Sequence, residues 1–150
     1  MDKIKAIEGI IVSSLKIINH PNGDLYHIMR HFDDGFMGFG EVYISTINYS
    51  SVKAWKKHLK MTCNFVVPVG KVKMVICDKR EKSVTFDVVN EFILSRENYF
   101  RLTVPPGLWY GFSGLTAGEN MILNLADISH DPEEQINIGK EDIDINYRWV

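Results

Sequence analysis

Polar and apolar side chains alternate over residues 52–67, and this spacing is typical of a β-strand with two unlike faces. The even positions carry the polar set, namely Lys56, His58, Lys60, Thr62 and Asn64. The odd positions from 61 to 67 carry Met, Cys, Phe and Val, which suit a core. The polar face either meets water, as one side of many antiparallel sheets does, or lines the mouth of a barrel, where ligand sites form.

His58 is the residue of this face best suited to move protons, because an unperturbed imidazole titrates near neutral pH. Lys56 lies two positions earlier and therefore on the same face, where its charge would lower the pKa of His58. A lysine there could also bind a phosphate or polarise a carbonyl group. We name His58 and Lys56 as candidate catalytic residues and Asn64 as a candidate substrate-binding residue.

The sequence predicts neither a metal site nor a cofactor. Its five histidines show no HxH, HxxH or HExxH spacing and are scattered over the chain, at positions 20, 27, 31, 58 and 130. It also lacks a P-loop, a GxGxxG segment and a GxSxG nucleophile motif. Cys63 has no positional pairing that marks a nucleophile, so it is interpreted as a core thiol.

A second window of interest runs from Thr103 to Phe112, where a strand ends at a Pro-Pro-Gly turn and aromatic residues follow at once. Trp109 and Tyr110 either close the end of a barrel or form a wall on which a sugar ring or a base stacks. Gly111 comes next, at a position where another backbone segment could approach closely.

The elements that must position these residues are predicted to be strands. Period-two alternation marks strands over residues 84–88, 100–104 and 121–125, and two β-rich runs around Gly70 predict a hairpin. Turn signals recur at short intervals, as in sandwiches and barrels. We expect one all-β domain over residues 1–150, a jelly-roll barrel, with a C-terminal segment that is a short helix or an extended arm.

The bulk composition excludes several function classes. Seventeen basic and nineteen acidic residues give a net charge of -2, which offers no electrostatic attraction for nucleic acid. The apolar stretch at 10–18 is interrupted and too short to span a bilayer, so we expect a strand there and no membrane partner. Cys63 and Cys77 form no CxxC pair and are predicted to be buried thiols, which favours the cytoplasm.

Several segments resemble the dTDP-4-dehydrorhamnose 3,5-epimerase family and its cupin relatives, among them the nucleotide-sugar 3,4-ketoisomerases. Residues 104–112 read VPPGLWYGF, where that family has (Ile/Val)-Pro-Pro-Gly-x-x-His-Gly-Phe. Residues 52–58 read VKAWKKH at the place of its Leu-Arg-Gly-Leu-His block. Segments 22–27, 131–134 and 145–149 are similar to further parts of its pattern. The resemblance implies a cupin-type jelly-roll β-barrel.

The departures from this pattern fall on the family's functional positions. Lys56 stands where the family has its catalytic histidine, and Tyr110 stands at its second histidine. Lys53 takes the place of an arginine that helps to hold phosphate, with the charge kept and the fork geometry lost. An ideal strand would turn Lys53 and Lys56 to opposite faces, so both can face one cavity only if a bulge intervenes.

Other family positions differ as well. Asn22 and His27 replace an arginine and a glutamate of the early Arg-Gly segment, and Ser129-His130 lies where the family has its catalytic tyrosine. The resemblance thus adds His130 to the candidate catalytic residues. It adds Asn22 and His27 to the candidate substrate-binding residues, alongside Trp109 as a stacking wall.

The resemblance implies a nucleotide-sugar epimerase or isomerase that acts next to the keto group of a dTDP-4-keto-6-deoxyhexose, in deoxysugar or surface polysaccharide biosynthesis. In this hypothesis His58 is the base and Tyr110 or His130 the acid. Lys56 stabilises the enolate and Lys53 holds the diphosphate. Because the family's histidines are replaced, two alternatives stay open: an inactive nucleotide-sugar-binding or accessory cupin, and a structural or regulatory cupin without a sugar ligand. The resemblance also implies a homodimer.

Overall fold

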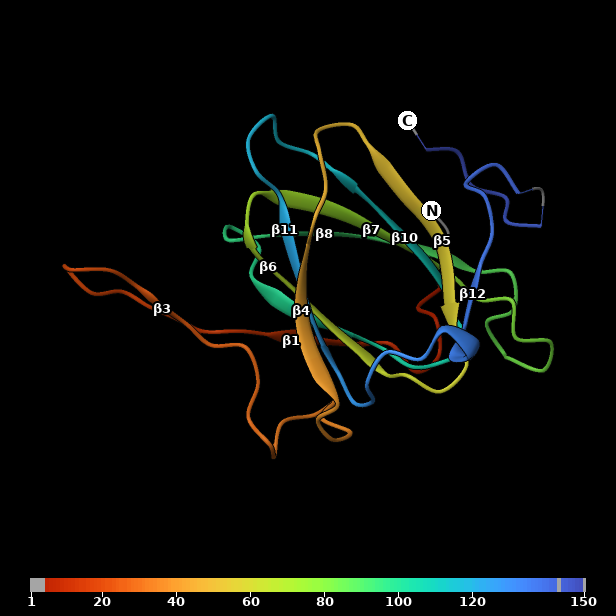
Figure 1. Cartoon of the computed structure of the whole chain (residues 1–150), viewed down its shortest axis with the longest axis horizontal. Helices are drawn as coiled ribbons and strands as arrows, with labels where there is room; N and C mark the ends of the chain where they lie inside the picture. The colour runs from red at the N-terminus through yellow and green to blue at the C-terminus, as the bar shows by residue number, and fades with distance from the viewer. Residues whose placement is uncertain (1–4, 143, 150) are drawn as a thin grey trace.

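The structure of the protein is a computed structural model that describes residues 5–142 and 144–149. Its regular structure is almost all β and follows the cupin-type jelly-roll plan, as the sequence predicts (Figure 1). The C-terminal part begins with a short 3₁₀ turn, η1 (Pro132–Glu134), which Asp131 caps, and continues as strand β12 (Gln135–Asn137). Within the described residues, no helix is long and apolar enough to cross a membrane.

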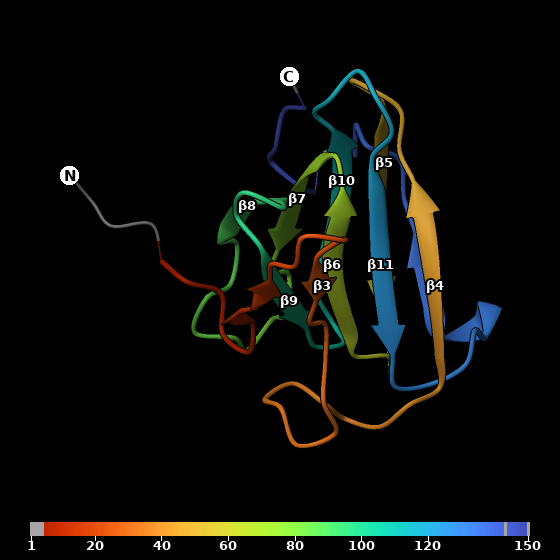
Figure 2. The same cartoon turned by 90° about the vertical axis from the view of Figure 1, so that its left-hand side faces the viewer.

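Two five-stranded antiparallel sheets form the barrel, and Figure 2 looks onto the first of them. The first sheet has the strand order β1 (Ile11–Ser14), β9 (Phe100–Val104), β6 (Cys63–Val69), β11 (Met121–Ala126) and β4 (Glu41–Thr46). The second has the order β12, β5 (Val52–His58), β10 (Trp109–Gly114), β7 (Lys71–Cys77) and β8 (Val89–Ser95). A separate ribbon, β2 (Ile17–Ile18) with β3 (Leu25–Tyr26), extends away from the barrel (Figure 1).

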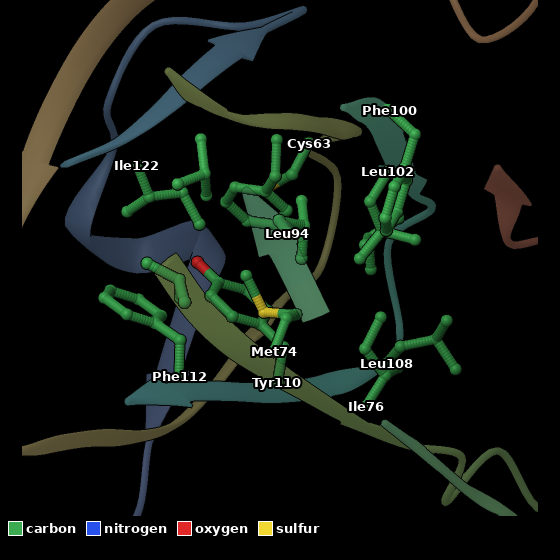
Figure 3. Packing of buried hydrophobic residues seen from close by; sticks show 14 of the residues in the cluster. Cys63, Met74, Ile76, Leu94, Phe100, Leu102, Leu108, Tyr110, Phe112 and Ile122 are labelled. Atoms are coloured by element: carbon green, nitrogen blue, oxygen red, sulfur yellow. The ribbon is translucent and has the colours of Figure 1, made fainter. Parts of the chain in front are cut away.

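The core lies between the two sheets because each sheet turns alternate side chains inward. In β11, Ile122, Asn124 and Ala126 are buried, whereas the intervening side chains are half-buried on the outer face. Figure 3 shows side chains of both sheets meeting in this core, among them Met74 of β7 and Leu102 of β9. Cys63 and Cys77 are both buried and free, as expected.

The hairpin predicted around Gly70 is wrong. Strands β6 and β7 do follow each other there, but β6 pairs with β9 and β11, whereas β7 pairs with β8 and β10. Gly70 is therefore a corner at which the chain passes from one sheet to the other. It has a φ of 80°, and a Cβ atom there would lie 2.3 Å from the carbonyl oxygen of Glu119, so glycine is required.

The strand predicted at 84–88 is also wrong, because this segment is a turn between β7 and β8. The hydroxyl groups of Ser83 and Thr85 each donate a hydrogen bond of 2.6 Å to Oδ2 of Asp78, which is fully buried. Arg80 binds the same carboxylate through Nε and Nη2. These polar contacts fold the segment back on itself, and the side chains of Val84 and Phe86 are left exposed.

The window at 52–67 is two strands rather than one. β5 and β6 lie in different sheets, and residues 59–62 connect them. The even-numbered residues therefore share no single face. Lys56 and His58 belong to the second sheet, whereas Asn64 belongs to the first.

Candidate active site

A cavity of about 380 Å³ opens between the two sheets at the end where β5 and β4 lie. Side chains of β5, β10 and β12 form one wall, and side chains of β4, β6 and β11 form the other. The lining residues are Tyr43, Ser45, Lys53, Ala54, Trp55, Lys56, Phe65, Tyr110, Phe112, Ile122, Asn124 and Asn137. Apolar walls with a few polar groups are typical of sites for small ligands.

A bulge in β5 turns both lysines toward this cavity. Lys56 lies opposite Tyr110 of β10, and Lys53 lies opposite Phe112, so four residues of β5 face three of β10. In a regular strand Lys53 and Lys56 would face opposite sides of the sheet, and the extra residue of the bulge turns both to the same side. The Nζ atom of Lys53 donates a hydrogen bond of 2.7 Å to the carbonyl oxygen of Thr46. The structure thus places Lys53 and Lys56 on one wall of the cavity.

Three buried side chains form a hydrogen-bonded row behind the same wall. Nδ1 of His58 bonds to Oε1 of Glu134, and Nε2 of His58 lies 3.1 Å from the hydroxyl oxygen of Tyr110. Because the carboxylate can only accept, the proton of the ring is assigned to Nδ1, and Nε2 accepts from the Tyr110 hydroxyl. Tyr110 alone of the three lines the cavity, with Phe112 and Ile122 near it (Figure 3).

Burial sets the resting protonation of this row. Removal from water lowers the pKa of His58, although the Glu134 carboxylate partly opposes the shift. Burial raises the pKa of Tyr110 well above its ordinary value. Burial also opposes ionisation of Glu134, but hydrogen bonds from His58 and from the amides of Lys60 and Met61 lower its pKa overall. At neutral pH the row therefore holds a phenol, a neutral imidazole and a carboxylate.

The facing wall presents a second phenol. Tyr43 of β4 lies opposite Asn124 of β11, whose Nδ2 donates a hydrogen bond of 2.9 Å to the Tyr43 hydroxyl oxygen. Oδ1 of Asn124 accepts from the backbone amide of Asn64 at 3.0 Å, which fixes the orientation of the amide group. Burial raises the pKa of Tyr43, so this phenol also keeps its proton at neutral pH.

Five of the predicted residues lie outside this cavity and outside the row behind it, and three of them belong to the barrel or to the segment after β11. Trp109 packs on the outer face of the second sheet with Cys77 and Ile145, so it does not form a stacking wall here. Asn64 is buried in the first sheet, where its side chain accepts from Thr103. His130 is exposed on the segment between β11 and η1.

Asn22 and His27 belong to the ribbon region. Asn22 is exposed at the turn between β2 and β3, where its backbone amide donates to Nδ1 of His20. His27 follows β3 and lines a separate cavity of about 370 Å³, together with Lys16, Arg30 and the buried Arg101. The structure does not bring either residue to the cavity that holds Lys56 and Tyr110.

Sequence reasoning missed Glu134, Tyr43 and Asn124. Glu134 is one of several acidic residues near the C-terminus, and the sequence does not distinguish it from the others. The position of η1 in the fold brings its carboxylate into contact with His58. Tyr43 and Asn124 lie 81 positions apart and meet through the pairing of β4 with β11. A buried polar residue amid the apolar alternation of 121–126 was the one signal available, since such a residue needs a partner.

Comparison with known proteins places these observations in a family context. The model of the family described as dTDP-4-dehydrorhamnose 3,5-epimerase matches residues 54–150. The crystal structure of a dTDP sugar isomerase from Desulfovibrio desulfuricans G20 is 36% identical, covers 95% of this chain and 92% of that chain, and superposes with a TM-score of 0.93.

More distant relatives cover nearly the whole chain too. The probable low-salt glycan biosynthesis epimerase Agl13 of Haloferax volcanii is 26% identical over 130 residues, which is 85% of this chain and 83% of that protein. The spore coat polysaccharide biosynthesis protein SpsL of Bacillus subtilis is 23% identical over 145 residues, which is 95% of this chain and 96% of that protein. The fold is also that of ChmJ, a 3'-monoepimerase from Streptomyces bikiniensis in complex with dTDP-quinovose, at 18% identity and a TM-score of 0.86, with 97% and 77% of the two chains covered.

Proposed function

The chain belongs to the dTDP-4-dehydrorhamnose 3,5-epimerase family, and we propose that it is an isomerase, a nucleotide-sugar epimerase or ketoisomerase acting next to the keto group of a dTDP-4-keto-6-deoxyhexose. The observation that carries this proposal is the cavity in which Lys56 stands beside Tyr110, with His58 and Glu134 behind it. The relatives named for glycan and spore coat polysaccharide biosynthesis support a role in deoxysugar or surface polysaccharide synthesis.

The proposed reaction begins with loss of the proton on the carbon next to the ketone. That proton passes to the Tyr110 oxygen while the phenolic proton of Tyr110 passes to Nε2 of His58. The electron pair of the broken C–H bond forms the enolate, whose negative oxygen is stabilised by the Lys56 ammonium group. Glu134 stabilises the imidazolium that forms. His58 thus keeps its proposed role as the base and acts through Tyr110.

Substrate binding is assigned to the rim and the apolar walls of the cavity. Lys53 is exposed at the rim, where its ammonium group can hold the diphosphate of the nucleotide. Phe65 and Phe112 offer apolar contact for the hexose. Tyr110 stands at the position of the family's second histidine. In this proposal it both transfers the proton and forms part of the wall of the sugar site.

We also propose a cytoplasmic homodimer. The outer face of β4 and β11 carries an apolar patch in which Val42 and Ile44 are half-exposed and pair in register with Leu125 and Leu123. The ribbon β2–β3 extends away from its own barrel and exposes further apolar side chains (Figure 1). A second copy would cover both surfaces, and the ribbon residues Asn22 and His27 could then complete the partner's site.

Proton NMR of the purified protein with dTDP-4-keto-6-deoxyglucose in deuterated water tests the proposed activity. Loss of the C3 or C5 proton signal supports enolate chemistry, and the position that loses it separates 3-epimerisation or 3,4-isomerisation from 3,5-epimerisation. Line broadening with unchanged signals supports the alternative, a binding or accessory cupin without turnover. No broadening and no exchange, with no thermal shift by any nucleotide sugar, would overturn both.

A further inference from the structure

We infer that Tyr43 is the second acid–base residue of this site and returns the proton to the face of the sugar opposite to Tyr110. The inference rests on the proposed function, because it assigns the other half of the same reaction. Inversion of a carbon next to a ketone needs one group that removes a proton from one face and another that supplies a proton to the other face. The cavity has phenols on both of its walls.

The two phenols reach the cavity from different sheets. Tyr110 belongs to β10 of the second sheet, and Tyr43 belongs to β4 at the edge of the first. Both line the same cavity of about 380 Å³, so a hexose bound there would lie between them. This arrangement is the one that proton removal from one face and proton return to the other requires.

Asn124 holds the Tyr43 hydroxyl oxygen at the wall of the cavity that both residues line. Its Nδ2 donates to the Tyr43 oxygen at 2.9 Å, and that contact occupies an acceptor position of the phenol. Among the described residues, no group accepts the Tyr43 hydroxyl proton, which leaves it free to be donated to a ligand. Ser45 is the other hydroxyl of this wall, but a phenol is a far stronger acid than an aliphatic alcohol and suits this step better.

The second half of the reaction balances in protons. The Tyr43 O–H bond breaks, its proton forms the new C–H bond, and the enolate electron pair returns as the keto group is restored. Tyr43 is 38% exposed, so its phenolate regains a proton from solvent water. His58 gives its extra proton back to Tyr110, whose substrate-derived proton leaves to water. Each inversion therefore replaces one carbon-bound hydrogen by one hydrogen from solvent.

The Tyr43→Phe variant separates proton removal from proton return, because it removes the proposed proton donor and keeps the aromatic ring. With dTDP-4-keto-6-deoxyglucose in deuterated water, we expect the variant to form the epimer at a rate lower by on the order of 100-fold. Deuterium should still enter the starting sugar, well above the rate seen with Tyr110→Phe, because Tyr110 and His58 can still remove and return the proton on one face. Epimer formation at the wild-type rate would overturn the inference.

Two control variants keep the outcome interpretable. Tyr49→Phe makes the same change at a tyrosine that is 60% exposed and lies outside the cavity, and it should leave epimer formation unchanged. Ser45→Ala tests the other hydroxyl of the wall, and an uncoupling of exchange from inversion in that variant instead would also overturn the inference. If the wild-type protein exchanges no carbon-bound proton of the sugar, the proposed function is wrong. If the wild type exchanges protons and Tyr43→Phe forms the epimer at the same rate, only the role assigned to Tyr43 is wrong.

Discussion

Nε2 of His58 lies 3.1 Å from the hydroxyl oxygen of Tyr110, and this contact places the tyrosine between the imidazole and the cavity. The two rings are stacked, with their centroids 5.8 Å apart. A histidine that is 4% exposed and bonded on both nitrogens cannot meet the sugar itself. Any proton that it accepts from a ligand in the cavity must pass through Tyr110.

Tyr110→Phe should therefore lower kcat by on the order of 100-fold or more, because it breaks the path to His58 and removes the proton carrier. The ring remains to pack against Phe65, so dTDP should still bind with an affinity close to that of the wild type. Steady-state kinetics and calorimetric titration with dTDP measure the two effects. Tyr49→Phe serves as the matched control, and a Tyr110→Phe enzyme with wild-type kcat would contradict the relay.

The pH profile should report the protonation of His58. The relay needs a neutral imidazole, so kcat/KM should fall as the pH drops through the pKa of His58, which burial places below its ordinary value near 6.5. Glu134 raises this pKa, and Glu134→Gln should accordingly move the acidic limb to lower pH. Loss of the charge-assisted hydrogen bond should also lower kcat by about 10- to 100-fold. If the acidic limb of the kcat/KM profile stayed at the same pH in Glu134→Gln, His58 would not be the group that accepts the proton.

The two lysines of β5 should separate in their kinetic effects. Lys56→Met removes the charge that we propose stabilises the enolate and should lower kcat by on the order of 100-fold, with a smaller change in KM. Lys53→Met removes the charge at the rim and should chiefly raise KM for the nucleotide sugar and weaken binding of dTDP. Kinetics of both variants with one substrate makes the comparison. Equal effects on kcat would contradict the division of roles.

The sequence predicted the fold class because alternation and turn residues are local signals. The strands at 100–104 and 121–125 were recognised in this way and form β9 and β11. It failed at Gly70, where the change of pairing partners depends on both sheets, and at 84–88, where hydrogen bonds to Asp78 override an alternating pattern. Both errors come from contacts that lie outside the window in which the pattern was measured.

The candidate site could be predicted only in part, for the same reason. Lys53, Lys56, His58 and Tyr110 lie on two neighbouring strands, and their types alone suggest acid–base chemistry. The order in which they lie was not predictable, because the position of His58 behind Tyr110 depends on Glu134, 76 residues away. Tyr43 was missed because an exposed-looking tyrosine on an edge strand resembles an ordinary surface residue until its partner Asn124 is known.

Asp78 offers a test of the fold that is independent of activity. Its buried carboxylate accepts hydrogen bonds from Arg80, Ser83 and Thr85. Burial alone would raise the pKa of Asp78, but these bonds lower it far below the ordinary value. Asp78→Asn should therefore reduce the free energy of unfolding by about 2 kcal/mol or more at pH 7. Urea unfolding followed by tryptophan fluorescence measures the change.

The sign of the pH dependence follows from the lowered pKa of Asp78. A carboxyl group whose pKa is lower in the folded state contributes its full stability above the unfolded pKa, about 3.9, and loses it as the pH falls further toward the folded value. The difference between the wild type and Asp78→Asn should thus be constant near neutral pH and shrink below about pH 4. Asp87→Asn is the matched control: Asp87 is 58% exposed in its pair with Lys79, so its loss should change the free energy of unfolding by less than about 1 kcal/mol. A difference that grows on acidification would show that Asp78 is not held as a carboxylate.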